Sequence, residues 1–320
     1  MDAYREGEMK LIENGNKKAI IAITCLFMLT TSGCGRSAVI TEQPNAQQTI
    51  DIEDAIVSYL GPEGTYTQEA CGVFFGNDGT YEPYSTVSDA VDALEAGAAD
   101  YSVIPQENTI GGAVTDYVDI VLAHEDLSVV GEVELPINQN LLAIPGTELS
   151  EIKTVYSHKQ GIAQGKDWLS SNLPGAEIVE VSSTAEGAKM VSESGDKTCA
   201  AIASAACVEV YGLEMIAEAI QGNESNKTRF YVLSKDTPVV AQAQRLAFVA
   251  SGSAKDFPSL MKEIKEQKMT LISVHDRPMK TELGEYRYLV ECTDCNYQNY
   301  LNLEKKCAMN LRYLGSFDVH

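Results

Sequence analysis

The chain has 320 residues, and its 24 Lys and Arg face 46 Asp and Glu, which gives a formal net charge of −22. A chain this acidic is a poor partner for nucleic acid or an anionic membrane surface, since both select basic patches. Its 44% of apolar residues excludes an acidic disordered chain, and its length allows two or three domains. The excess of negative charge is also concentrated in one part of the chain. Residues 37–152 contain no Lys or Arg and twenty-one acids, whereas residues 153–320 hold nineteen cations and twenty-one acids.

The N-terminal segment has the pattern of an export signal. Two lysines precede an apolar run over residues 19–29 that is too short to span a bilayer, and small residues then lead to Cys34. We therefore expect a signal peptide over 1–33, a lipidated Cys34 of the bacterial lipoprotein type, and a flexible tether over 34–54. This pattern predicts an extracytoplasmic protein anchored to a bacterial membrane by lipid alone; a cytoplasmic protein is the alternative. The translation start is left open between Met1 and Met9.

The other cysteines give little support for special chemistry. Cys292-Thr-Asp-Cys295 is a lone Cys-x-x-Cys with no second pair and no nearby His, so it is weak support for a metal or redox site. The pattern favours ordinary buried or free thiols, and a disulfide between these two residues is left open.

From residue 55 to about 212, short apolar runs, polar turns and helical patterns alternate. Five such units are expected, with strands at 56–60, 101–104, 154–156, 177–181 and 200–203 and helices ending near Phe75, Ala123, Leu169, Val191 and Tyr211. Ser157 with Gln160, and Ser183 with Glu186, have the spacing of capping boxes. The alternation predicts an α/β fold with mostly parallel sheets.

In such sheets a ligand binds beyond the carboxyl ends of the strands, where helices begin. The expected junctions there are rich in Gly, Ser, Thr, Asn and Gln and nearly empty of cations. Backbone N–H groups and the positive ends of helices face that crevice. The sequence therefore predicts a small polar anion held by neutral donors.

After residue 244 the order of elements changes. Strands are expected at 246–250, 271–274, 286–292 and 311–317, and helices at 257–267 and 296–309. This is the βαββαβ order of a ferredoxin-like domain.

Six short motifs, in order, resemble the prephenate dehydratase family over residues 55–320. They are Gly61-Pro-Glu-Gly-Thr65, Val103-Ile-Pro-Gln-Glu-Asn-Thr109, Tyr156-Ser-His158 with Gln160 and Gln164, Ser183-Thr-Ala185, Tyr211-Gly-Leu213 and Asn226-Lys-Thr-Arg-Phe230. The last is that family's signature. The C-terminal part resembles an ACT domain, with His275-Asp-Arg-Pro278 where the family has Glu-Ser-Arg-Pro.

The resemblance implies a fold and domain boundaries. The catalytic domain would cover 55–235, with two subdomains in the manner of type 2 periplasmic binding proteins and the active site between them. The subdomains would be about 55–135 plus 220–235, and 136–219, with crossings near 135–142 and 220–231. The ACT domain would cover 244–320, and the family association implies a homodimer or homotetramer.

The resemblance also implies an activity and its residues. Prephenate would lose its ring carboxylate as CO2 and its ring hydroxyl as water to give phenylpyruvate. This lyase step of phenylalanine biosynthesis is driven by aromatisation and needs no cofactor or metal. Thr228 would act on the departing hydroxyl, with Asn108, Ser157 and Gln164 orienting the substrate. The substrate-binding residues would be Gly64, Thr65, Lys159, Arg229 and Phe230.

Arg229 and His158 carry a charge or can titrate, so each could have a further role. Arg229 is the only Arg between residues 37 and 244, so we expect it to add positive potential and to dominate substrate affinity among the few cations, which also include Lys159, Lys166 and Lys227. His158 could be an acid or base, but we interpret it as an orienting or packing residue.

Departures from the family pattern affect substrate choice and regulation. Gln106, Thr109, Gly111, Gln139 and Lys159 replace usual residues, which leaves a preference for arogenate over prephenate open. The family's phenylalanine site would involve Leu260, His275, Asp276, Arg277 and Pro278. Pro258 stands there where Gly is expected, and it removes an N–H group. We therefore expect weak or absent control by L-phenylalanine.

The fold permits a second class of function. The alternative to the enzyme is a non-catalytic, lipid-anchored binding protein or sensor that kept the fold and lost the chemistry. Export favours this alternative. The enzyme is favoured by the presence of the family's site residues, which are Asn108, Ser157, Gln164, Thr228, Arg229 and Phe230.

Overall fold

The computed structural model describes residues 52–76, 79–113, 115–223, 225–236 and 243–320. The expected signal peptide, Cys34 and most of the expected tether lie outside these residues. The described residues belong to one compact unit. In the described part of the chain, no helix is both long enough and apolar enough to cross a membrane.

The first α/β layer is a mixed sheet with the strand order β2-β1-β3-β11-β5, and β4 pairs with β3. The strands are β1 (Ile56–Leu60), β2 (Thr80–Tyr84), β3 (Tyr101–Asn108), β4 (Gly112–Ala113), β5 (Ser128–Pro136) and β11 (Lys227–Ser234), and the helices are α1 (Tyr66–Phe75), α2 (Val87–Ala96) and α3 (Thr115–Ala123). β1 is parallel to β2 and β3, whereas β11 is antiparallel to β3 and β5. The sheet is therefore parallel only in part, because β11 returns from the second sheet in the opposite direction.

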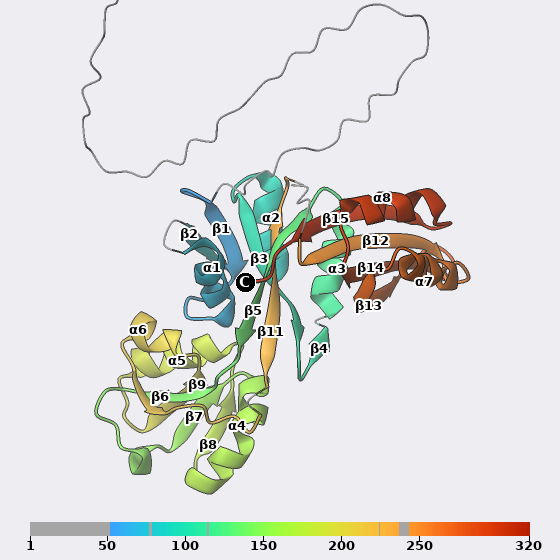
Figure 1. Cartoon of the computed structure of the whole chain (residues 1–320). Coiled ribbons are helices and arrows are strands. Elements are labelled where there is room, and N and C mark those ends of the chain that lie inside the picture. The colour runs from blue at the N-terminus through green and yellow to red at the C-terminus, as the bar shows by residue number, and fades with distance from the viewer. Residues whose placement is uncertain (1–51, 77–78, 114, 224, 237–242) are drawn as a thin grey trace, which may run out of the picture. The chain divides into compact units, whose positions relative to one another are not determined.

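The second α/β layer has the strand order β10-β6-β9-β7-β8. Its elements are β6 (Asn140–Ala143), the 3-10 turn η1 (Leu149–Glu151), β7 (Thr154–Ser157), α4 (Lys159–Asn172), β8 (Glu177–Glu180), α5 (Thr184–Ser194), β9 (Cys199–Ala203), α6 (Ala206–Tyr211) and β10 (Glu214–Ala217). The chain leaves the first sheet after β5 and comes back along β11, and Figure 1 shows these two strands side by side. This confirms the expected pair of periplasmic-binding-protein-like subdomains.

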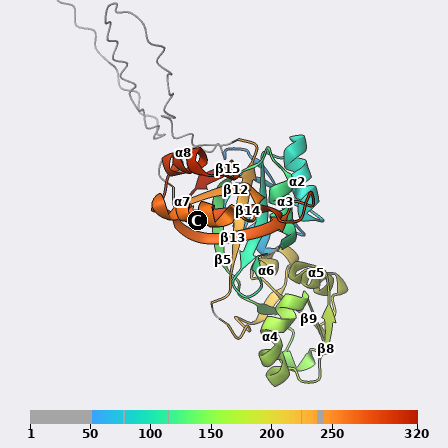
Figure 2. The same cartoon turned by 90° about the vertical axis from the view of Figure 1, so that its right-hand side faces the viewer.

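The C-terminal region has the predicted βαββαβ order. It contains β12 (Arg245–Ser253), α7 (Phe257–Glu266), β13 (Thr270–Pro278), β14 (Glu285–Thr293), α8 (Tyr297–Lys306) and β15 (Asn310–Phe317). Its antiparallel sheet has the order β13-β14-β12-β15, and both helices pack on one apolar core. Figure 2 shows this sheet facing the viewer, with the second subdomain below it.

The C-terminal sheet is joined closely to the first sheet. One apolar core runs from Leu94 and Val121 to Leu289 and Phe317, so it belongs to both regions. The backbones also meet: a Cβ on Gly315 would lie 2.0 Å from the carbonyl oxygen of Val129, a distance that no side chain tolerates. After β15, the N–H of Glu132 donates to the carbonyl of Asp318, and that of Glu134 donates to the carbonyl of His320.

Three arginines of the C-terminal sheet hold the end of α3. Arg287 donates to the carbonyl of Leu122 at 2.9 Å, Arg312 donates to the carbonyl of Glu125 at 3.0 Å, and Arg277 pairs with Asp119 at 2.7 Å. Cations are favourable at a helix C-terminus, where carbonyl groups lack helical partners. The C-terminal sheet therefore supports α3, which carries Tyr117 into the wall of the pocket described next.

Candidate active site

A cavity of about 340 Å³ lies between the two α/β subdomains. Its walls come from both subdomains and from both crossing segments. The lining residues are Leu60, Thr65, Tyr66, Thr67, Pro105, Asn108, Tyr117, Ile137, Gln139, His158, Gln160, Gly161, Gln164, Ser182, Ser183, Thr184, Thr228 and Phe230. Among these described residues there is no Lys, Arg, Asp or Glu.

Three helices begin at this pocket. The side chain of Thr65 caps α1 by accepting from the N–H of Gln68, His158 Nδ1 caps α4 by accepting from the N–H of Gln160, and Ser183 caps α5. The N-terminal ends of helices carry partial positive charge and backbone N–H groups. The pocket therefore offers an anion three helix ends and neutral side chains, as the sequence predicted.

Thr228 and Asn108 form the polar centre of one wall. They are paired across β11 and β3, and Asn108 Nδ2 donates to Thr228 Oγ1 at 2.9 Å and to Asn226 Oδ1 at 2.9 Å. Asn108 Oδ1 accepts from the backbone N–H groups of Ile110 and Gly111 at 3.0 and 3.1 Å. Because Thr228 already accepts from Asn108, its own O–H is directed elsewhere and can donate into the pocket.

A pair of glutamines forms the opposite polar wall. Gln139 Nε2 donates to Gln164 Oε1 at 2.9 Å, which fixes the orientation of the Gln164 amide. The backbone of Gln139 is itself held, because its N–H donates to Gln221 Oε1 at 2.8 Å. Gln164 Nε2 and Gln139 Oε1 are buried, and neither atom has a hydrogen-bond partner among the described residues. One buried donor and one buried acceptor are thus available to a ligand.

The sequence marks Gln139 only as a departure from the family pattern and assigns it no role. Its position gives a weak signal, because it lies at the first predicted crossing between subdomains, where a cleft is expected.

The turn before α1 is held by the second subdomain. Ser204 Oγ and Cys207 Sγ donate to the carbonyl of Gly64, at 2.9 and 3.2 Å, and Tyr211 donates to the carbonyl of Glu63 at 2.7 Å. Burial raises the pKa of Cys207 to about 11, so it stays a protonated donor. A Cβ on Gly64 would lie 2.8 Å from Cys207 Sγ, and its φ of +80° also favours glycine.

This turn does not fully have the substrate-binding role that the sequence predicts for Gly64 and Thr65. The N–H of Gly64 donates to Gln68 Oε1 at 2.6 Å, so it is not free to bind a substrate carboxylate. Thr65 lines the pocket as expected, and its hydroxyl donates to the carbonyl of Leu60 at 3.2 Å.

Several predicted site residues are not brought to the pocket. Ser157 is fully buried and donates to the carbonyl of Ile202 at 2.8 Å. Lys159 is exposed, and Lys227 pairs with Glu134 at 3.6 Å. Thr228, Phe230, Asn108 and Gln164 do line the pocket.

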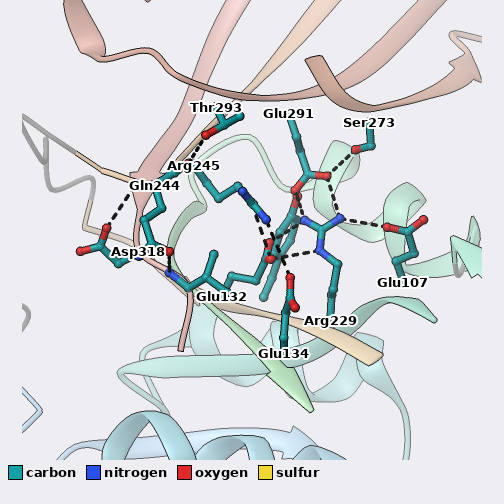
Figure 3. Close-up of polar contacts among 12 residues, drawn as sticks. Glu107, Glu132, Glu134, Arg229, Gln244, Arg245, Ser273, Glu291, Thr293 and Asp318 are labelled. Atoms are coloured by element: carbon teal, nitrogen blue, oxygen red, sulfur yellow. Dashed lines mark hydrogen bonds and ion pairs between the residues drawn. The ribbon is translucent and has the colours of Figure 1, made fainter. Parts of the chain in front are cut away.

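The placement of Arg229 corrects its expected role as a substrate-binding residue. Side chains alternate along a strand, so the neighbours Thr228 and Phe230 face the pocket and Arg229 faces away from it. Its guanidinium lies among the carboxylates of Glu107, Glu132 and Glu291, as Figure 3 shows.

The predicted regulatory residues lie in the C-terminal domain. Leu260 is fully buried in its core on α7. His275, Asp276, Arg277 and Pro278 follow one another at the end of β13. Cys292 and Cys295 are free thiols, as are the other four cysteines of the described residues.

The fold and the pocket define a class: a two-subdomain α/β protein with an uncharged cleft between its subdomains, joined to a ferredoxin-like domain. Residues 57–238 match the family model for prephenate dehydratase. The chain is 36% identical over 267 residues to a bifunctional chorismate mutase/prephenate dehydratase of Neisseria gonorrhoeae, covering 82% of this chain and 74% of that protein. It is 30% identical to a prephenate dehydratase of Lactococcus lactis subsp. cremoris, covering 82% of this chain and 98% of that protein.

Solved structures agree with the sequence relatives. Prephenate dehydratase in complex with L-Phe from Arthrobacter aurescens superposes with a TM-score of 0.74 at 28% identity, covering 82% of this chain and 90% of that one. The enzyme of Staphylococcus aureus gives a TM-score of 0.70 at 26% identity, covering 82% and 99%. This chain belongs to the prephenate dehydratase family.

His158 provides a test of acid or base chemistry in the pocket. Burial and then the charge of Lys159 lower the pKa of His158, against an opposing effect of Glu180, so the ring is neutral and Nδ1 can accept from Gln160. Asn is also a good helix cap. We expect His158→Asn to keep kcat within about threefold, whereas loss of a general acid or base costs about 10²-fold or more. Steady-state kinetics decide between the two.

The same substitution has a predicted pH dependence. A His whose folded-state pKa is lowered contributes stability above its unfolded value of about 6.5, and this contribution is lost as the pH falls toward the folded value. Urea unfolding at several pH values should therefore show the unchanged chain losing stability relative to His158→Asn below about pH 6.5. A difference in stability that stays constant with pH would contradict the capping role.

Proposed function

We propose that this chain catalyses the decarboxylating dehydration of prephenate: prephenate and one proton give phenylpyruvate, CO2 and water. Membership of the prephenate dehydratase family supports the reaction. The single observation in the structure that carries it is the Thr228 hydroxyl, fixed by Asn108 in the wall of an uncharged pocket.

The pocket suits a substrate with two carboxylates and a tertiary ring hydroxyl. The helix ends at Thr65, His158 and Ser183 orient the anion, and the amide of Gln164 provides a buried donor. Thr228 donates its hydrogen bond to the ring hydroxyl and so stabilises the negative charge that develops as this group leaves. The proton consumed in the reaction ends on the departing water.

Neutral donors have a specific advantage in this reaction. The ring carboxylate must release its electron pair into the ring as CO2 leaves. A fixed cation at that group would stabilise the ground state more than the transition state and would slow the step. The described residues that line the pocket place no cationic side chain there.

Substitution of Thr228 tests the reaction. Thr228→Ala should lower kcat by about 10²-fold or more, because the donor to the departing hydroxyl is lost, whereas Thr228→Ser keeps the hydroxyl and should stay within about tenfold. Phenylpyruvate formation is followed by its absorbance, with prephenate and arogenate as parallel substrates.

Three results would change the proposal. Turnover of arogenate in preference to prephenate would reassign the substrate. Binding of prephenate without turnover by the unchanged chain would favour the binding protein or sensor. Equal rates for Thr228→Ala and the unchanged chain would remove Thr228 from the mechanism.

We further propose that the C-terminal region is an ACT domain with weak or absent L-phenylalanine binding. The βαββαβ order supports the domain type, and the complex of the Arthrobacter aurescens enzyme with L-Phe shows the ligand in a relative. In this chain Pro258 is the second residue of α7 and removes a backbone N–H group that an amino-acid ligand needs. Association into homodimers or homotetramers is proposed on the same family resemblance.

Isothermal titration calorimetry with L-phenylalanine tests the regulatory proposal. We expect no binding in the micromolar range by the unchanged chain and stronger binding after Pro258→Gly, which restores the N–H group. Micromolar binding by the unchanged chain would contradict the proposal.

We also propose that the chain is exported and anchored to a bacterial membrane through lipid on Cys34, which lies outside the described residues. The basic, apolar and small-residue pattern before Cys34 supports this location. Mass spectrometry of the membrane fraction should show a chain that begins at Cys34 and carries acyl groups. A chain that keeps residues before Cys34 in the soluble fraction would favour the cytoplasm.

A further inference from the structure

The carboxylate of Glu291 belongs to the C-terminal sheet, yet it contacts the strand that carries Thr228. Glu291 lies on β14, and its side chain is fully buried. Its two oxygens accept from Arg229 Nη2 at 2.6 Å and Nη1 at 3.2 Å. The hydroxyls of Tyr231 and Ser273 donate to the same carboxylate. Glu291 is therefore held by hydrogen bonds from both β11 and β13 (Figure 3).

Arg229 links Glu291 to the first sheet. Besides its bonds to Glu291, it donates through Nε and Nη2 to the oxygens of Glu132 at 3.0 and 2.5 Å, and through Nη1 to Glu107 at 2.9 Å. All five N–H donors of the guanidinium are thus engaged. A guanidinium bound on three sides has little freedom to move, and the backbone of β11 is fixed with it.

The anchored position lies directly beside the reacting groups. Arg229 follows Thr228 on β11, and Glu107 precedes Asn108 on β3; both pairs face one another across the two strands. The register shifts at the next step, where Phe230 pairs with Pro105 and Gln106 has no partner on β11. Such a bulge disrupts the ladder locally and changes the direction of nearby side chains. The ion pair between Arg229 and Glu107 fixes the register at the last regular position before the bulge.

We propose that Glu291 is a positioning residue of the dehydratase site, acting through Arg229 to fix the Thr228 hydroxyl against Asn108. Glu291 touches neither the pocket nor the substrate. Its loss frees the guanidinium on one side, and Thr228 then departs from the geometry that the reaction requires. This inference rests on the proposed function, because it is measured through prephenate turnover.

Glu291→Gln in the full chain is the direct test. The substitution keeps the shape of the side chain and removes the charge that holds Arg229. We expect kcat to fall between about 10-fold and 100-fold, since small misplacements of a reacting group have effects of this size. The KM for prephenate should change much less, because the lining residues stay in place. Glu291→Asp, which keeps the charge, should recover part of the lost kcat.

Two control variants distinguish a loss of kcat caused by misplaced reacting groups from one caused by a general loss of folding stability. Val290 lies on the same strand as Glu291 and is buried in the C-terminal core. Val290→Ala opens a cavity there and so lowers the thermal midpoint, but it leaves the contacts of Arg229 in place. Glu285→Gln removes a charge from the start of β14, away from the cluster. Both variants should keep kcat within about twofold of the unchanged chain, measured well below their thermal midpoints.

Ser273→Ala is a second test of the positioning role, for the case in which Glu291→Gln does not fold. It removes one hydrogen bond to Glu291 while the ion pair remains, and kcat should fall measurably with KM unchanged. A folded Glu291→Gln chain with unchanged kcat, or a Val290→Ala chain with an equal loss of kcat, would overturn the positioning role while leaving the dehydratase intact. An unchanged chain that does not turn over prephenate would overturn both.

Discussion

The ionic contacts of Arg229 are the constraint on which the rest of the structure depends. One cation, 13% exposed, meets Glu132 and Glu291, which are both fully buried. Burial alone would raise the pKa of Glu291, but the charge of Arg229 and hydrogen bonds from Arg229, Ser273 and Tyr231 outweigh it and lower that pKa. For Glu132, burial prevails and the pKa is raised despite Arg229. Removing one partner from a buried pair commonly costs about 3–5 kcal/mol, because the other charge stays buried without compensation.

Some of the acids concentrated in residues 37–152 meet cations from later in the chain. In the described residues these acids are Glu107, Asp119, Glu125, Glu132 and Glu134. Most of these ion pairs lie where the first sheet meets the C-terminal sheet. Glu132 and Glu134 face Arg245, Asp119 pairs with Arg277, and Glu125 with Arg287. The more exposed of these pairs, such as Glu125 with Arg287, contribute little individually. The cleft differs from this junction, because its described lining residues include no Lys, Arg, Asp or Glu.

Much of the architecture could be predicted from sequence. The strand from Ile56 to Leu60, the cap at Ser183 and the C-terminal βαββαβ order agree with the structure, because each depends on local hydrophobic period or capping chemistry. Ser157 failed as a cap, since its hydroxyl bonds to the carbonyl of Ile202 and His158 caps α4 instead. That choice depends on a neighbouring strand, β9, which is remote in sequence. The antiparallel insertion of β11 is likewise a tertiary feature without a local signal.

The residues of the segment Asn226–Phe230 can be identified from the sequence as important, but the sequence does not show which role each one has. A motif marks five consecutive residues as important, but an extended strand sends alternate side chains to opposite faces. Thr228 and Phe230 therefore serve the pocket, while Arg229 serves the junction with the C-terminal sheet. An arginine alone in an acidic region suggests attraction of an anionic substrate. In the structure Arg229 instead meets the buried carboxylates of Glu132 and Glu291. Arg229 thus belongs to the junction between the sheets, while the cleft presents helix ends and neutral amides.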